Sequence, residues 1–211
     1  MKTNETKLLR EISKDQNSKI LDWGCGRGAL IDELISLGCS SVNGLEVDSI
    51  FARQDINIDS DTIAWLEDRP GKFDVIVTHE AMYYINKNEQ DRLWLAFYKA
   101  LAPGGKIVVI TFNGALESSK WIFQKDLDIK LIPNEILLRN LAVSAGFEGI
   151  DIFAITPTVR TLMGKIVFSI FAIYRKLSYK MKFLSERGID SENPTLFTKQ
   201  ILLRATKPDI P

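Results

Sequence analysis

Three glycines alternate with other residues directly after an apolar run, and this spacing indicates a ligand-binding loop. The segment "ILDWGCGRGALIDE", residues 20–33, places Gly24, Gly26 and Gly28 between a strand pattern and a helical pattern. Such a loop lets the backbone approach a ligand closely, with a helix N-terminus behind it. The spacing satisfies the G-x-G-x-x-G/A fingerprint of dinucleotide sites, and it equally satisfies a G-x-G-x-G loop that belongs to a different cofactor. The glycines alone leave both cofactors open.

Asp22 separates these two interpretations by its charge. It stands two residues before Gly24, at the end of the expected strand. A dinucleotide would place its pyrophosphate at this loop, and a carboxylate would repel that group. S-adenosylmethionine carries no phosphate, and its ammonium and sulfonium groups suit a carboxylate. Glu46 ends the next expected strand, where an acid can bind the ribose hydroxyls of either cofactor. Asp22 therefore favours S-adenosylmethionine.

The segment "THEAMYY", residues 78–84, follows a β-branched strand pattern and is expected to face the reacting groups. His79, the chain's single histidine, could take a proton from an acceptor hydroxyl, because imidazole titrates near neutral pH. Alternatively, it packs against the cofactor or hydrogen-bonds its methionine portion. Glu80 could bind a substrate cation, or it could cap the following helix or have another structural role. Tyr83 and Tyr84 could line the acceptor pocket, with one of them in the core.

Two further groups of side chains are interpreted as lacking a catalytic role. Cys25 lies inside the glycine loop and is expected to be a small packing residue, not a nucleophile. The acids Asp59 and Asp61 lack a recognisable metal-ligand spacing, and the sequence has no Cys/His cluster. No metal is therefore expected.

These residues require a sheet to bring them together, and strand patterns do alternate with helical patterns along the chain. We predict strands at 19–23, 41–48, 73–78, 106–112, 148–155 and 196–205, and helices at 7–12, 29–38, 90–101 and 134–145. This alternation predicts a three-layer, doubly wound α/β sheet that is mostly parallel. The last strand follows a long helical insert, which leaves room for it to enter the sheet antiparallel.

The composition is that of an ordinary globular protein with no charge bias. The 211 residues are 45% apolar and 26% charged with a net charge of zero, which predicts one domain over 1–211 and no nucleic-acid partner. Two cysteines and a polar N-terminus predict a cytoplasmic protein. The apolar run 166–174 is far short of the roughly 20 residues that span a bilayer.

The predicted helical insert, residues 156–194, combines an apolar helical stripe with basic residues toward its C-terminal half. Three interpretations remain open. The insert packs on the core or on a second subunit through 158–187; it touches an anionic membrane or a lipid-linked substrate; or it forms a lid whose bases hold an anionic group of a small acceptor.

Four segments in order and spacing resemble the motifs of class I S-adenosylmethionine-dependent methyltransferases: "ILDWGCGRG", "GLEVD", "FDVIVTHEAMYYI" and "LAPGGKIVVI". The resemblance covers about residues 19–112 and implies a Rossmann-like sheet of seven strands with an antiparallel seventh. It assigns Asp22, the glycine loop with Cys25, and Glu46 to the cofactor.

The chain departs from this family after Glu46, where a full helix and a third strand usually precede the adenine-contacting acid. Only eight residues separate Glu46 from Asp55. "FARQDI", residues 51–56, is interpreted as the third strand and its end, which places Asp55 at the adenine amino group and Ile56 at its ring. Asp59 is the alternative acid.

The resemblance implies direct in-line methyl transfer that leaves S-adenosylhomocysteine and needs no metal. Faint similarity to MetW-type proteins and to methyltransferases of sugars and lipo-oligosaccharides suggests a small-molecule or glycan/lipid-precursor acceptor. The alternative is a catalytically inactive, cofactor-binding relative that acts through a partner.

Overall fold

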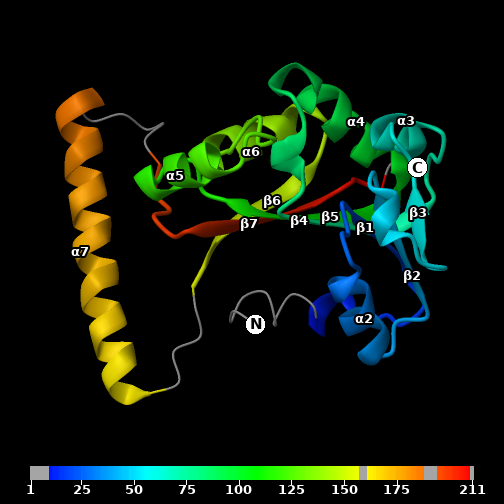
Figure 1. Ribbon diagram of the computed structural model, residues 1–211, viewed down its shortest axis with the longest axis horizontal. Coiled ribbons are helices and arrows are strands. Elements are labelled where there is room, and N and C mark those ends of the chain that lie inside the picture. The colour runs from blue at the N-terminus through cyan, green and yellow to red at the C-terminus, as the bar shows by residue number, and fades with distance from the viewer. Residues whose placement is uncertain (1–9, 157–160, 188–193, 210–211) are drawn as a thin grey trace.

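The computed structural model describes residues 10–156, 161–187 and 194–209, whose strands form one seven-stranded sheet (Figure 1). The strands are β1 (Lys19–Trp23), β2 (Ser41–Glu46), β3 (Ile56–Ile58), β4 (Phe73–His79), β5 (Leu101–Phe112), β6 (Glu148–Ile155) and β7 (Gln200–Thr206). Their order is β3-β2-β1-β4-β5-β7-β6, and β7 alone runs antiparallel to its neighbours. The predicted fold class is confirmed.

Two apolar clusters, one on each face of the sheet, form the core. The larger includes Trp94 and Phe97 of α4 (Gln90–Ala100) together with Leu138 of α6 (Glu135–Ser144). The smaller includes Ile31 and Leu34 of α2 (Ala29–Ser36). Figure 1 shows α4 and α6 on one side of the sheet and α2 on the other. Because the central strands are buried from both sides, they read as continuous apolar runs in the sequence.

The antiparallel β7 brings a late part of the chain to the carboxyl end of β5. Gln200 pairs with Phe112 and Thr206 pairs with Lys106. A strand that enters the sheet antiparallel starts where its parallel neighbour ends. The first residue of β7 therefore lies at the sheet edge where "THEAMYY" begins.

The structure differs from the predicted elements at several places. It adds two helices that were not predicted, α3 (Thr62–Glu67) and α5 (Glu117–Lys125), and a 3₁₀ turn, η1 (Ser49–Phe51). The last strand begins at Gln200 instead of residue 196. Of the predicted helix 7–12, residues 10–12 are helical and the rest lies outside the described residues.

The helix of the predicted insert, α7 (Leu162–Arg187), stands at one end of the sheet (Figure 1). It meets the rest of the chain through Tyr179, whose ring stacks on Phe197 at 5.5 Å, and through an ion pair between Lys182 and Glu117 of α5. Residues 157–160 and 188–193 of the insert lie outside the described residues. No helix in the described part of the chain is long and apolar enough to span a bilayer.

Candidate active site

The loop between β1 and α2 is shaped by three glycines in left-handed backbone. Gly24, Gly26 and Gly28 have φ angles of 73°, 51° and 77°, which residues with a Cβ rarely adopt. A Cβ on Gly24 would lie 2.2 Å from that of Ala81, and one on Gly28 would lie 2.8 Å from Nη1 of Arg53. A Cβ on Gly26 would meet no atom of the described residues within 4 Å. Packing against Ala81 therefore requires glycine at position 24, the positive φ favours glycine at position 28, and Gly26 lines an open cradle.

Asp22 precedes this loop near the end of β1, and its carboxylate is buried without full hydrogen bonding. The side chain is 2% exposed, and Oδ1 has no hydrogen-bond partner among the described residues. Burial, and then the charge of Glu46, raise the pKa of Asp22 from 3.8 to about 7. A cation at Oδ1 would stabilise the charged form, because opposite charges attract strongly in a buried site. An ammonium group fits this position, and a pyrophosphate does not.

Glu46 ends β2 and connects that strand to the glycine loop. Its Oε2 accepts a hydrogen bond from the backbone N–H of Gly26 at 2.8 Å, and its Oε1 accepts one from that of Val47 at 2.7 Å. An ionised carboxylate has about four acceptor positions. Glu46 can therefore hold the loop in place and also accept hydrogen bonds from ribose hydroxyls.

Cys25 fills the space between the loop and β2. A Cβ on Gly44 would lie 2.5 Å from Sγ of Cys25, so glycine is required at this point of β2. Burial, followed by the charges of Asp22 and Glu46, raises the pKa of the Cys25 thiol to about 12. The thiol stays protonated at neutral pH, which agrees with the predicted packing role, since nucleophilic cysteines react as thiolates.

The third strand lies later in the chain than predicted, because β3 begins at Ile56 instead of ending there. Asp55 therefore lies at the amino end of β3, where Arg53 donates to both of its carboxylate oxygens at 2.9 and 2.7 Å. Arg53 also pairs with Asp32 of α2, and this fixes the turn before β3. These bonds lower the pKa of Asp55. The side chain of Ile56 is buried, with Cδ1 3.3 Å from a Cβ placed on Gly28.

Asp59 follows β3 directly and lies at its carboxyl end. Its backbone N–H donates to the carbonyl oxygen of Glu46 at 3.0 Å, so the two acids are neighbours. The contact of Asp55 and Ile56 with adenine stays a prediction. Asp59, the alternative acid, lies beside Glu46 at the edge of the sheet where the ligand of an open α/β sheet binds.

His79 ends β4, half-buried, and Glu80 follows it in strained backbone. Glu80 has a φ of 56°, the single positive value among the described non-glycine residues. Its N–H donates to the carbonyl of Ile110 at 2.8 Å, and its Oε1 accepts a hydrogen bond from Nε2 of buried Gln200. Of the structural roles expected for Glu80, capping is not observed, because the following turn η2 (Met82–Tyr84) has no side-chain cap among the described residues. The side chain is instead held by β7.

A cavity of about 630 Å³ lies beside the end of β5. It is lined by Tyr83, Phe112, Trp121, Ile122, Lys125, Asp126, Leu127, Ile129 and Lys199. The Tyr83 ring is buried and stacks on Phe112 at 5.6 Å. Burial raises the pKa of Tyr83, so its hydroxyl stays protonated. The exposed Tyr84 donates to Asp126 at 3.2 Å from outside this lining.

The structure brings three residues to the site that sequence reasoning missed. Ala81 packs against Gly24, Arg53 fixes the turn before β3, and Gln200 holds Glu80. Arg53 carried a signal, because it is the one base between residues 44 and 68. Gln200 carried none, since it lies 120 residues from its partner. In the described part of the chain, no group of three or more His, Cys, Asp or Glu could hold a metal ion.

The family model that is described as a methyltransferase domain matches residues 3–150, from the start of the chain into β6. The chain belongs to this methyltransferase family. The resemblance of the glycine loop and the later segments to class I S-adenosylmethionine-dependent methyltransferases is thereby confirmed, without resolution of the subfamily.

Solved structures of methyltransferases share the fold of this chain. One from Archaeoglobus fulgidus, described as S-adenosylmethionine-dependent, superposes with a TM-score of 0.68 and 17% identity over 97% of this chain and 93% of that chain. The phosphoethanolamine N-methyltransferase 2 of Haemonchus contortus, in complex with S-adenosylmethionine, superposes with a TM-score of 0.60 and 18% identity over 97% of this chain and 52% of that chain.

Sequence relatives of the chain are named as O-methyltransferases and as an N-methyltransferase. The ubiquinone biosynthesis O-methyltransferase of Bartonella bacilliformis is 29% identical over 158 residues, which is 65% of this chain and 63% of that protein. The chain spans less than two thirds of that relative, and 46% and 47% of two others. Nothing in these relatives favours the catalytically inactive alternative.

Proposed function

We propose that this methyltransferase transfers the methyl group of S-adenosylmethionine to a small-molecule or glycan/lipid-precursor acceptor. The observation that carries this proposal is the buried carboxylate of Asp22 at the glycine loop, whose Oδ1 has no hydrogen-bond partner among the described residues. A negative group at that point suits a cationic cofactor and opposes a pyrophosphate.

The surrounding residues supply the other cofactor contacts in this proposal. Glu46 takes the ribose hydroxyls, and the backbone around Gly26 makes room for close approach of the ligand. Asp59 takes the adenine amino group in place of Asp55, because Asp59 lies beside Glu46 and Asp55 is committed to Arg53.

The acceptor occupies the cavity beside Tyr83 and Phe112 in this proposal, with Tyr84 at its border. Its aromatic lining suits a flat apolar body, and Lys125 and Lys199 suit an anionic group on the same molecule.

The cofactor, when bound, supplies the reactive methyl carbon. The residues of the chain align the acceptor and exclude water, and His79 takes the proton when the acceptor atom is a hydroxyl oxygen. Glu80 borders the same site as a charge held by Gln200.

The test is transfer of a labelled methyl group from S-adenosylmethionine to fractions of a cell extract, with parallel calorimetry of cofactor binding. We expect labelled product with the wild-type protein and none with Asp22→Asn. Cofactor binding without labelled product in any fraction would support the catalytically inactive alternative. A His79→Gln protein that keeps full turnover on a hydroxyl acceptor would remove His79 from the mechanism.

A further inference from the structure

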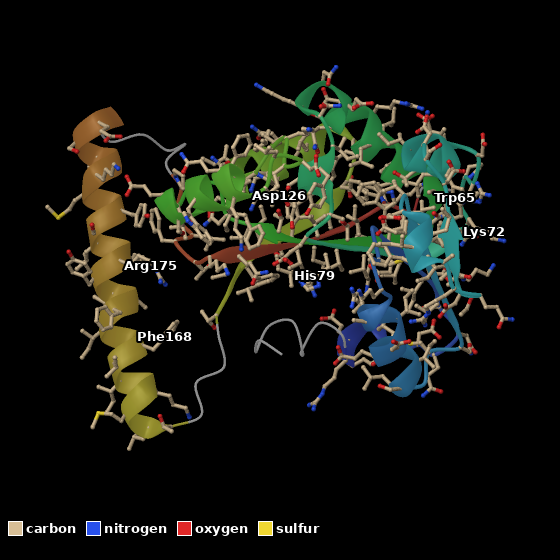
Figure 2. All side chains as sticks on the ribbon, viewed as in Figure 1. Trp65, Lys72, His79, Asp126, Phe168 and Arg175 are labelled. Carbon is tan, nitrogen blue, oxygen red and sulfur yellow. The ribbon has the colours of Figure 1, made fainter. Side chains whose placement is uncertain are left out.

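Helix α7 turns its most apolar face away from the rest of the protein. Its half-buried side chains include Phe168, Ala172, Arg175 and Tyr179, whose spacing of four, three and four residues places them in one row. Figure 2 shows Phe168 and Arg175 directed toward the sheet. Tyr179 makes the contacts with Phe197 and with the backbone N–H of Glu117. This row is the inner face of α7, and it is a mixture of apolar and polar groups.

The opposite side of α7 carries a continuous apolar row, which we name the outer stripe. It consists of Ile166, Ile170, Ile173, Leu177, Met181 and Leu184, again at intervals of three and four residues. These side chains are between 37% and 69% exposed. A soluble helix normally buries its apolar stripe against the core, and exposed apolar patches of this extent mark an interaction surface.

Basic residues border the outer stripe along one side. Lys165, Lys176 and Arg187 recur every eleven residues, about three helical turns, and Lys180 lies one turn beyond Lys176 on the same side. The described helix carries six bases and one acid, Glu186. Long basic side chains beside an apolar stripe can reach lipid headgroups while their stems cover apolar surface.

The charge pattern decides between the two occupants that could cover this stripe. A second copy of the chain would bring the same row of bases to the contact, with one acid per helix to offset them. An anionic lipid surface supplies both an apolar layer for the stripe and opposite charge for the bases. We propose that α7 lies on the surface of an anionic membrane, with the outer stripe in the lipid and the basic row at the headgroups.

Vesicle co-sedimentation of the full chain, without cofactor or acceptor, tests this proposal independently of methyl transfer. We expect binding to vesicles that contain about one third phosphatidylglycerol, weak binding to phosphatidylcholine alone, and loss of binding between about 0.1 M and 0.5 M salt. Lys176→Gln, Lys180→Gln and Arg187→Gln should each lower the affinity about fivefold, since each base near an anionic surface contributes about 1 kcal/mol.

Two matched pairs of serine substitutions distinguish the outer stripe from other exposed apolar residues. Ile170→Ser with Leu177→Ser should abolish vesicle binding, whereas Leu95→Ser with Val143→Ser, which are exposed apolar residues of α4 and α6, should leave it unchanged. Thermal melts check that each variant is folded. The proposal is overturned if the wild-type protein ignores anionic vesicles. It is also overturned if sedimentation velocity shows a dimer that the Ile170→Ser, Leu177→Ser protein loses while vesicles bind neither form.

Discussion

At the scale of single residues, the proposed cofactor binding depends on one carboxylate that the fold holds in an unfavourable environment. Asp22 is buried, near Glu46, and its Oδ1 is without a partner among the described residues. Such a group lowers the stability of the protein and is retained where it does chemistry or binds a ligand. Stability and cofactor affinity should therefore respond oppositely when the charge is removed.

Replacing Asp22 by asparagine should raise the stability of the cofactor-free protein while it abolishes cofactor binding. The amide keeps the shape of the side chain and removes the buried charge, so we expect a gain of a few kcal/mol in the free energy of unfolding at about pH 8. Urea unfolding and calorimetric titration give the two quantities. Asp68→Asn, at an exposed position, is the control and should change neither. An Asp22→Asn protein that still binds S-adenosylmethionine would contradict the assignment.

The stability of the cofactor-free protein should fall as the pH rises from about 4 to 7. The pKa of Asp22 is about 7 in the folded protein against 3.8 unfolded, so the folded state binds the extra proton in this window. The stabilisation is fully present below pH 3.8 and is lost as the pH passes through about 7. The difference is about 4 kcal/mol from this group, at 1.36 kcal/mol per pKa unit.

Cofactor affinity should run the other way over the same range, since a bound cation requires the charged carboxylate. Calorimetry between about pH 5 and 7 should show affinity rising about tenfold per pH unit. In the Asp22→Asn protein, the fall in the free energy of unfolding with pH that Asp22 causes should be absent. An unchanged slope in that variant would assign the effect to another group.

In the glycine loop, an added Cβ lowers stability through a steric clash and through backbone strain, and these two contributions can be measured separately. Gly24→Ala should lower the free energy of unfolding by about 3 kcal/mol, because the new Cβ meets Ala81 and φ is positive. Gly71→Ala is the control for backbone cost alone, since its φ is 64° and its Cβ would meet nothing among the described residues within 4 Å. Adding Ala81→Gly to Gly24→Ala should recover the steric part. Equal losses for Gly24→Ala and Gly71→Ala would show that the contact with Ala81 is unimportant.

The place of a residue in the fold could be predicted from the sequence where its neighbours along the chain determine it. Asp22, Gly24 and Glu46 end a strand or begin a turn, so strand patterns alone place them at one edge of the sheet. Asp55 was placed differently because its position depends on an ion pair with Arg53, which in turn pairs with Asp32, 21 residues away from Arg53. Arg53 is recognisable as the one base between residues 44 and 68, but its pairing with Asp32 is not visible in any local pattern.

At the scale of elements, the antiparallel β7 holds the strained turn after β4. Gln200→Leu should lower the free energy of unfolding by about 2 kcal/mol, because the partly buried carboxylate of Glu80 loses a charge-assisted hydrogen bond. In a Glu80→Ala background the same change should cost clearly less, and denaturant titration of the four proteins gives the coupling. Additive losses would mean that the two side chains act independently.

The elements that were predicted are those with long and regular patterns. Strands β1, β4 and β6 were found from apolar runs, and α6 from its periodicity and from Asn134, whose side chain caps the helix. The three-residue β3 and the six-residue α3 are too short for periodicity to define them. Helix α5 was missed because its apolar residues include exposed ones such as Trp121, so they do not define one buried face.

At the scale of the whole molecule, the match to the family model ends earlier in the chain than the sheet does. The match to the methyltransferase family model ends at residue 150, within β6, whereas the sheet is completed by β7, which follows α7. The periodicity of α7 was visible in the sequence, but the direction of its apolar face was not, because a helical stripe does not indicate what it packs against. The prediction of one domain over 1–211 stays a prediction.

The most direct test of the account is calorimetric titration of the wild-type protein with S-adenosylmethionine, S-adenosylhomocysteine and NADH. The charge of Asp22 and the open cradle at Gly26 predict binding of both sulfur nucleosides and none of NADH. Binding of NADH alone, or of none of the three, would contradict the assignment of the glycine loop to S-adenosylmethionine.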